Sequence, residues 1–271
     1  PTFGIVFGAY ALQFFSPDGQ FFVPDVRWFA RRETTQTAIV RALVAGPSPW
    51  LEPGVVNAIP AGSRLDADSV PVAGSTATVN LAMDTLPSAD GLSRMQAQLQ
   101  SSLAGVSGIT SVAISVNGTA ENVAPLMPAP SVAPTVDSRP AVLTSSVFGF
   151  VSSVSGQIEP IPALSAALVD LAPNAISLGA GAAFAAARTD EGIFRVGAAG
   201  TQSVFSGTGW VAPTVDPSGG IWAARSSRSV SWQGADGGEA EFASRWGDAV
   251  VEGIAVSRDG ARIAAVLQTG S

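Results

Sequence analysis

The second half of the chain repeats one short pattern at intervals close to 40 residues. The pattern is an apolar strand, a turn that contains glycine, and a large apolar residue that leads into two alanines. It occurs in ISLGAGAAFAAAR at 176–188, PTVDPSGGIWAAR at 213–225 and IAVSRDGARIAAV at 254–266, whose starts lie 37 and then 41 residues apart. A weaker copy, RPAVLTSSVFGFV, occupies 139–151. Because four-stranded β-propeller blades repeat about every 40 to 45 residues, this spacing predicts the blades of a propeller.

The last copy of the pattern, at 254–266, begins a hairpin close to the end of the sequence. A propeller ring closes with about four to eight blades. We therefore expect three blades and the beginning of another, and we expect the natural protein to continue beyond Ser271. The alternative is a β-sandwich whose final hairpin is formed by 254–266.

Residues 1–123 mix helix and strand signals, and we predict an α+β domain for this part. One helix is expected from Thr34 or Thr35 to Gly46, and a second from about Ser88 to Leu103, where apolar residues recur at spacings of three and four. The segments that are typical of strands are TFGIVF, YALQFF, QFFVPDV, VPVAGSTATVNL and ITSVAISVNG.

Composition changes abruptly between Ala124 and Pro140, where five prolines occur within 17 residues. Proline cannot donate a hydrogen bond to a strand ladder and breaks a helix, so 124–140 is predicted to be an extended linker. It separates the domain at 1–123 from an all-β region of partial β-propeller blades at 141–271. In that region we expect no helix beyond a single turn at PALSAALVDLA.

The composition also excludes several classes of function. With 14 basic and 21 acidic residues and no basic cluster, the chain is not expected to bind nucleic acid. It contains neither His nor Cys, which excludes Ser-His-Asp and Cys-His catalysis and zinc-thiolate sites. No apolar run reaches the roughly 18 residues of a membrane-spanning helix. We therefore expect no catalytic, cofactor-binding or metal-binding residues, and a protein that is not an enzyme.

Four stretches resemble functional motifs but lack essential parts. Asp66–Asp68 could begin a calcium loop, yet the glycine at the sixth position and the final glutamate are missing, so we expect a solvated loop. GAGAAF from Gly179 resembles a phosphate-binding loop without the helix that must follow it. The turn around Asp216 resembles the Asp-box turns of sialidase propellers. A sialidase needs a tyrosine nucleophile, however, and the single tyrosine of this chain, Tyr10, lies in the other predicted domain. The acidic run from Asp236 is expected to be an exposed turn, with a partner-binding patch as the alternative.

The loop GPSPWLEPG places Trp50 among three prolines. An aromatic side chain on a rigid loop is a good anchor for a partner, because binding costs little conformational entropy. Trp50, with its neighbours Pro49 and Leu51, is therefore our candidate partner-binding site. The alternative is that Trp50 closes off the end of its own domain.

Segments in both halves of the chain resemble one known protein family. RALVAGPSPWLEPGVVNAIPAGSRL, with STATVNL and RMQAQLQSSL, resembles the GerMN domain of the LpqB lipoprotein family of actinobacteria, so the α+β domain at 1–123 is expected to be GerMN-like. VFGFVSSVSGQIEPIP, APNAISLG, WVAPTVDPSGGIWA and SRDGARIA are similar to the start of the propeller that follows it there. The resemblance covers nearly the whole chain in the same order, and its most specific part is 42–64.

The resemblance implies an accessory protein that a lipid anchors to the extracytoplasmic face of the cell membrane. In that family the protein binds the extracellular domain of the sensor histidine kinase MtrB and influences two-component signalling in cell-wall homeostasis and division. The resemblance brings no catalytic residues. Because the chain has no cysteine to carry the lipid, membrane association through that anchor lies outside this sequence.

Two other functions remain open at this point. The domains could recognise a cell-wall glycan or a small molecule, which an exposed tryptophan in a polar groove would favour. The second domain could instead be a glycoside hydrolase of the propeller type, which would require an acidic cleft with two carboxylates about 5 to 10 Å apart. A broad exposed apolar patch would favour a protein partner.

Overall fold

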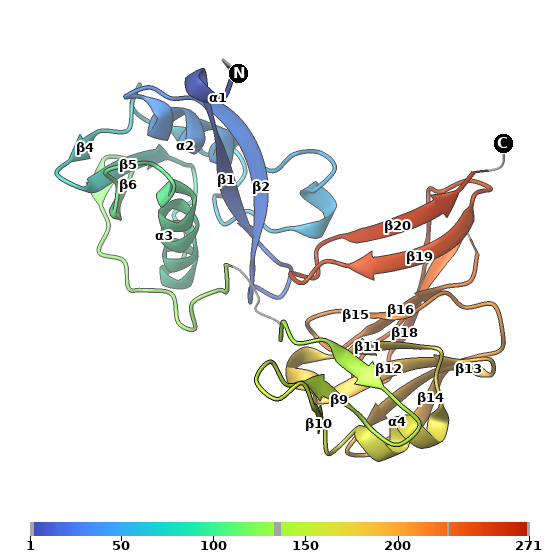
Figure 1. Ribbon diagram of the computed structural model, residues 1–271. Helices are drawn as coiled ribbons and strands as arrows, with labels where there is room; N and C mark the ends of the chain where they lie inside the picture. Colours follow the sequence, from blue (N-terminus) through green and yellow to red (C-terminus); the bar gives the residue numbers. More distant parts are fainter. Residues whose placement is uncertain (1–2, 133–136, 227, 270–271) are drawn as a thin grey trace. The chain divides into compact units, whose positions relative to one another are not determined.

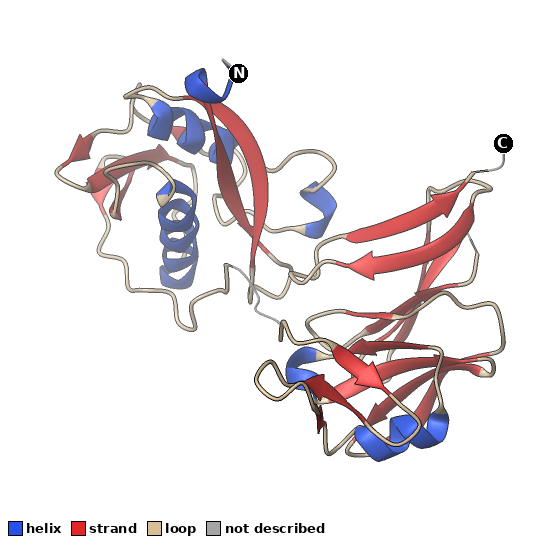
Figure 2. Ribbon diagram, viewed as in Figure 1, coloured by secondary structure: helices blue, strands red, loops and turns tan. Residues whose placement is uncertain are grey.

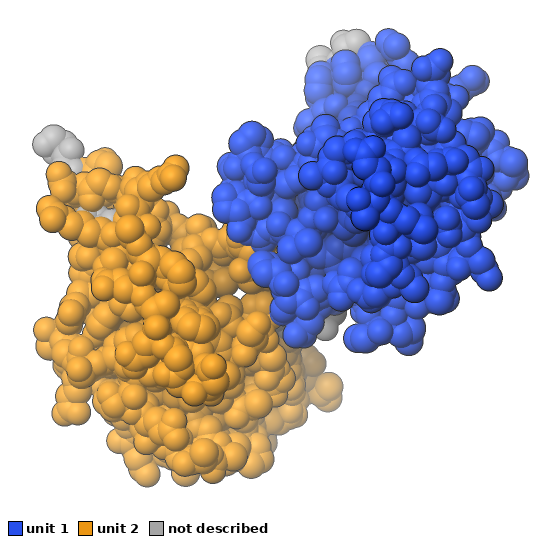
Figure 3. Space-filling view, turned by 180° about the vertical axis from the view of Figure 1, so that it is seen from behind, with its two compact units in different colours: residues 1–134 blue, residues 135–271 orange. Residues whose placement is uncertain are grey.

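The computed structural model describes residues 3–132, 137–226 and 228–269. The chain divides into two compact units, Pro1–Pro134 and Thr135–Ser271, which Figure 3 shows in different colours. The division falls within the proline-rich segment, and four residues of the predicted linker, 133–136, lie outside the described residues.

Unit 1 contains a long antiparallel hairpin of β1 (Phe7–Phe15) and β2 (Phe22–Ala30), drawn in shades of blue in Figure 1. The turn between the strands is closed by side chains: the Ser16 hydroxyl donates to Asp18, and the Phe21 N–H donates to Ser16 Oγ at 3.0 Å. Gly19 adopts a φ of 73°, which suits a residue without a Cβ.

Before β1 the chain forms a single helical turn, α1 (Phe3–Val6). The predicted strand in TFGIVF is therefore wrong over these four residues. The reason is the length of the hairpin, since β2 ends at Ala30, which pairs with Phe7. Residues before Phe7 have no strand to pair with.

The rest of unit 1 is a small sheet with a parallel crossover. β5 and β6 are parallel neighbours joined by α3, and the strand order is β3-β5-β6-β7, with β4 also pairing with β5. The elements are α2 (Thr35–Ala45), η1 (Glu52–Gly54), β3 (Arg64–Leu65), β4 (Val72–Ala73), β5 (Thr76–Ala82), α3 (Ala89–Leu103), β6 (Ser111–Val116) and β7 (Thr119–Ala120). Both predicted helices are confirmed. Ser88 caps α3 by accepting the Gly91 N–H at 3.1 Å, and Gly46 follows α2 with a φ of 95°.

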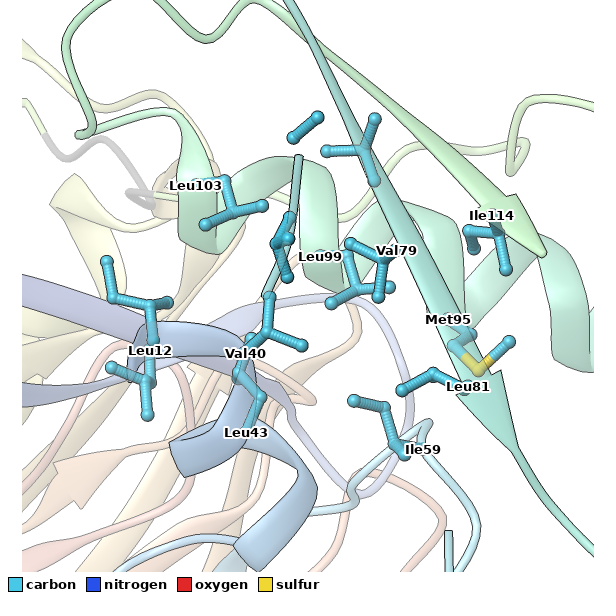
Figure 4. Close-up of a cluster of buried hydrophobic side chains, with 14 of the residues drawn as sticks. Leu12, Val40, Leu43, Ile59, Val79, Leu81, Met95, Leu99, Leu103 and Ile114 are labelled. Carbon is cyan, nitrogen blue, oxygen red and sulfur yellow. The ribbon is translucent and has the colours of Figure 1, made fainter. Parts of the chain in front are cut away.

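A single core holds unit 1 together, and Figure 4 shows its centre. Leu12 from β1 meets Val40 and Leu43 from α2, while the sheet contributes Val79 and other apolar residues. The predicted apolar stripe of α3 faces this core, with Met95, Leu99 and Leu103 fully buried. Full burial of each such side chain contributes about 1.5–3 kcal/mol.

Part of the proline-rich segment is attached to unit 1. The Ser131 N–H donates to the Gln20 carbonyl at 2.9 Å, and the Phe22 N–H donates to the Ser131 carbonyl at 2.8 Å. This parallel bridge beside the β1–β2 turn was not predicted from the proline count. It forms because Ser131 keeps the N–H that its proline neighbour lacks.

The described residues of unit 2 form four antiparallel sheets that follow one another along the chain (Figures 1 and 2). The first has the order β10-β9-β8, the second β11-β12-β13-β14, the third β15-β16-β17-β18 and the fourth β19-β20. Their strands are β8 (Ala141–Leu143), β9 (Phe148–Val151), β10 (Ile158–Pro160), β11 (Ala175–Leu178), β12 (Phe184–Thr189), β13 (Gly192–Gly197), β14 (Gly200–Ser206), β15 (Thr214–Val215), β16 (Ile221–Ala224), β17 (Ser229–Gln233), β18 (Glu239–Ala243), β19 (Val250–Val256) and β20 (Ile263–Gln268).

The sequence repeat coincides with these sheets. Each copy covers the turn between the first two strands of a sheet: 139–151 joins β8 to β9, 176–188 joins β11 to β12, 213–225 joins β15 to β16, and 254–266 joins β19 to β20. Four successive sheets of neighbouring strands match propeller blades and differ from the two facing sheets of a sandwich. The prediction of partial propeller blades is confirmed, and the sandwich alternative is wrong.

The first sheet has three strands, and a helix, α4 (Ser165–Leu171), follows β10. The expectation of a single turn here was too short. Leu164 and Leu168 are fully buried and pack with Phe148, so tertiary contacts stabilise a helix whose local signal is weak. Among the described helices, none is long and apolar enough to cross a bilayer.

Candidate binding surfaces

Trp50 lies on the short loop between α2 and η1, and its side chain is 65% exposed. Pro49 is also exposed. The alternative in which Trp50 closes off the end of its own domain does not fit this exposure. The tryptophan instead presents its ring to solvent from a loop that is fixed on both sides.

The first fixed point is Asp25 on β2, a carboxylate that is only 3% exposed. It accepts the Ser48 N–H at 2.9 Å and the Ser48 hydroxyl at 2.9–3.0 Å. Arg27 donates to the same carboxylate at 2.7 Å and to the Gly46 carbonyl at 2.8 Å. The hairpin thus holds both the end of α2 and the residue two positions before Trp50.

The charge of Asp25 is stabilised by these contacts. Burial acts to raise the pKa of the Asp25 carboxyl, but hydrogen bonds from the Arg27 guanidinium and from the N–H and hydroxyl of Ser48 act to lower it, as does the positive charge of Arg27. The net result is a pKa below the usual value. The carboxylate is therefore ionised at neutral pH, and charge-assisted hydrogen bonds of this kind are among the stronger ones in proteins.

Leu51 is the second fixed point, and here the sequence prediction needs correction. Its side chain is 1% exposed, so it cannot contact a partner while the domain is folded. Leu51 instead anchors the loop in the protein, because an apolar side chain next to an exposed tryptophan gains free energy by burial. Beyond η1, Val56 pairs with Phe15 through two backbone hydrogen bonds of 2.8 and 2.9 Å.

Unit 2 contains a groove with a volume of about 600 Å³ between β8 and β9 on one side and β11 on the other. Arg139 lies in its lining and donates to Asp137 at 2.6 Å and to Glu159 at 2.7 Å, with its guanidinium 4.7 Å from the Phe150 ring centroid. Hydrogen bonds from Arg139 lower the pKa of Asp137 to about 2. These residues were not predicted as a site, since Glu159 on β10 meets Arg139 only when β9 pairs with both β8 and β10.

The turn at Asp216 has a structural role. One carboxylate oxygen accepts the Gly220 N–H at 2.8 Å, and the other accepts the indole N–H groups of Trp222 at 2.8 Å and Trp232 at 3.2 Å. A carboxylate with three donors on its two oxygens is engaged in holding the third sheet together.

The remaining motifs lie in turns and loops. GAGAAF forms the turn η2 (Ala180–Ala182) between β11 and β12, and Asp236 is exposed between β17 and β18. Asp66 is exposed and accepts a hydrogen bond from Asn80 at 2.9 Å. Within the described residues, no group of three acidic side chains lies close enough to hold a metal ion.

Two protein families match the chain. Residues 11–122 match the Germane family, described as sporulation and spore germination, and residues 149–271 match the Gmad1 family, described as the lipoprotein LpqB beta-propeller domain. Neither description names an enzyme.

Solved structures show weaker likenesses. The tandem GerMN domains of the sporulation protein GerM from Bacillus subtilis share 16% identity at a TM-score of 0.34, over 70% of this chain and 59% of that one. A streptogramin B lyase shares 20% identity with this chain at a TM-score of 0.32. Virginiamycin B lyase from Staphylococcus aureus shares 16% identity at a TM-score of 0.31. Each match covers 45% of this chain and 42% of the other. The chain thus spans less than two thirds of each structure, and scores this low do not extend the lyase activity to it.

Proposed function

The chain has the domain architecture of the LpqB lipoproteins, a GerMN domain followed by the LpqB beta-propeller domain, and from this premise we propose that it is a non-catalytic accessory protein of the cell envelope. A lipid outside this sequence would hold it at the extracytoplasmic face of the membrane. Its partner in this proposal is the extracellular domain of a sensor histidine kinase of the MtrB type.

The observation that carries the proposal is the exposed Trp50 on a loop that is already fixed. Asp25 and the buried Leu51 hold the loop in one conformation before any partner arrives. Binding then costs little loop entropy, and tryptophan is the residue type most enriched among side chains that dominate interface energies.

Regulation follows from binding by linkage. A bound accessory protein changes kinase activity only if it prefers one of the kinase's conformations, and it shifts the equilibrium by the ratio of its affinities for the two. The proposal therefore needs surface complementarity to one kinase state and requires no chemical step.

The test is the affinity of the protein for the purified extracellular domain of the kinase, measured by biolayer interferometry. Trp50→Ala is expected to weaken binding by about 30-fold, which corresponds to about 2 kcal/mol for an interface anchor. Trp28→Ala, at another exposed tryptophan of the same unit, is the matched control and should change the affinity less than twofold. The proposal would be contradicted if the unmodified protein did not bind the kinase domain, or if Trp50→Ala bound it with the affinity of the unmodified protein.

A second candidate function is the binding of a cell-wall glycan or small molecule in the groove of unit 2. It is favoured by Arg139, which two carboxylates hold in place over the Phe150 ring, since ligand sites combine an apolar wall with a few fixed polar groups. Calorimetric titration with soluble cell-wall fragments distinguishes the two candidates. Heat that disappears in Arg139→Ala and persists in Trp50→Ala would favour the groove.

A further inference from the structure

The β1–β2 hairpin has two apolar faces. One packs on the core of unit 1, where Leu12 and Phe14 are fully buried. On the other face, Val26 is 59% exposed and Trp28 is 54% exposed. Because side chains alternate along a strand and Ala9 and Ala11 are the residues paired with Trp28 and Val26, this outer face is apolar on both strands.

The helical turn α1 enlarges this outer face. Phe3, Ile5 and Val6 are 56%, 74% and 47% exposed. The Phe3 ring centroid lies 5.0 Å from that of Trp28 and 4.8 Å from that of Phe7, so α1 and the hairpin form one continuous surface. We call Phe3, Ile5, Val6, Val26 and Trp28 the outer apolar surface.

Two arginines border this surface where β2 ends. Arg31 and Arg32 are exposed, and the Arg31 N–H donates to the Val6 carbonyl at 2.9 Å. In the described part of the chain, neither guanidinium forms an ion pair with a carboxylate. The nearest carboxylates along the chain are Asp25, which Arg27 and Ser48 occupy, and the exposed Glu33.

We infer that the outer apolar surface inserts into the headgroup region of a bilayer that contains anionic lipid, with Arg31 and Arg32 on the lipid phosphates. Protruding aliphatic side chains, an exposed tryptophan among them and adjacent guanidinium groups are the combination that a membrane interface accommodates. The arginines provide charge complementarity on a chain whose net charge of −7 would otherwise oppose an anionic surface. This contact adds to the lipid anchor of the proposed function and does not depend on it.

Binding to vesicles tests the inference directly, because the chain has no cysteine to which a lipid could be attached. The protein is sedimented with vesicles of phosphatidylcholine and phosphatidylglycerol at 3:1, and with pure phosphatidylcholine, over a range of lipid concentrations. The unmodified chain is expected to bind the anionic vesicles more tightly. The double change Ile5→Ser and Trp28→Ala should lower the partition coefficient on both by at least about tenfold.

The contribution of the two arginines to vesicle binding is measured separately. Arg31→Gln and Arg32→Gln should each lower binding to the anionic vesicles by about fivefold and leave binding to phosphatidylcholine unchanged, since each cation gains about that factor near an anionic surface. Trp50→Ala is the matched control and should bind as the unmodified chain does. Thermal unfolding of each variant confirms that the fold is retained, as all substituted side chains are exposed.

Depth of insertion can be measured with brominated lipids, which quench nearby tryptophan fluorescence. Quenching that is lost in Trp28→Phe supports insertion of this surface. Failure of the unmodified chain to sediment with either vesicle overturns the inference. So does concentration-dependent self-association that Ile5→Ser with Trp28→Ala abolishes, since this would identify the surface as a protein interface.

Discussion

Asp25 connects the hairpin to the loop that carries the candidate anchor. Its carboxylate is on β2, yet its hydrogen bonds go to Ser48, 23 residues further along the chain. A buried carboxylate is stable only with partners, and Arg27 and Ser48 provide them. The conformation of the loop around Trp50 therefore depends on a buried residue of another element, Asp25 on β2.

Replacing Asp25 with Asn keeps the shape of the side chain and removes its charge. The carboxamide accepts at one oxygen only, so some donors of Arg27 and Ser48 lose their partner. We expect Asp25→Asn to lower the free energy of unfolding by about 1–3 kcal/mol, measured by denaturant unfolding at pH 7. An unchanged unfolding midpoint would show that the carboxylate contributes no stability.

The pH dependence of this loss has a defined sign. The folded state lowers the pKa of Asp25 below its unfolded value near 3.8, so the unfolded state takes up the proton first. The stabilisation is fully present above the unfolded pKa and is lost as the pH falls through the lower folded pKa. The difference in melting temperature between the unmodified chain and Asp25→Asn should therefore be largest at neutral pH and shrink below about pH 4.

Turns of the same type close one hairpin in each unit. Ser257 and Asp259 make the hydrogen bonds that Ser16 and Asp18 make, with the serine hydroxyl accepting a backbone N–H five residues later at 3.0 Å in both. In each turn the fourth residue is a glycine with a φ of 73°. The hairpin at 254–266 was predicted, and the predicted strand segments YALQFF and QFFVPDV flank the other turn, because these interactions are local and need no tertiary contact.

The pairing of β9 with β10 depends on Gly149. A Cβ at this position would lie 2.0 Å from the Glu159 carbonyl oxygen and 2.8 Å from the Pro160 Cα, both backbone atoms that cannot move alone. We expect Gly149→Ala to destabilise unit 2 by about 1–3 kcal/mol or more. Differential scanning calorimetry measures the effect.

Gly253 in β19 is the matched control, since nothing lies within 4 Å of the Cβ that an alanine would add there. Gly253→Ala should change stability by less than about 0.5 kcal/mol. Equal effects of the two substitutions would contradict a specific role for the β9–β10 contact.

At the scale of the whole molecule, the two units have separate cores. The cluster of unit 1 contains residues from 12 to 116, whereas the clusters of unit 2 begin at Phe148. A domain with its own core can unfold on its own. We therefore expect calorimetry to resolve two transitions.

Substitutions should assign these transitions to the units. Asp25→Asn is expected to shift one transition, and Asp216→Ala the other, because it leaves the indole groups of Trp222 and Trp232 without their acceptor. A single cooperative transition that both substitutions shift together would refute independent units.

Much of the fold could be predicted from the sequence because its signals are local and periodic. The apolar stripe of α3, the glycine after α2 and the repeat in 139–266 each reflect a constraint that acts within one element or one hairpin. α1 and α4 could not be predicted in the same way. One exists because the partner strand ends at Ala30, and the other because Leu164 and Leu168 meet a sheet formed by more distant residues.

For the candidate sites, too, only the features that depend on neighbouring residues could be predicted. The prolines around Trp50 indicated a rigid loop, but adjacent positions in the sequence could not show that Trp50 is exposed while Leu51 is buried. Asp25, at an inward position of a strand among apolar residues, was the available signal for a buried polar contact, although its partner Ser48 was not evident. The amino-acid sequence was enough to predict both long helices, the repeated hairpins and the division into an α+β part and a β-rich part. Which side chains face solvent and which charges meet became clear only from the folded chain, because exposure and pairing depend on residues far away in the sequence.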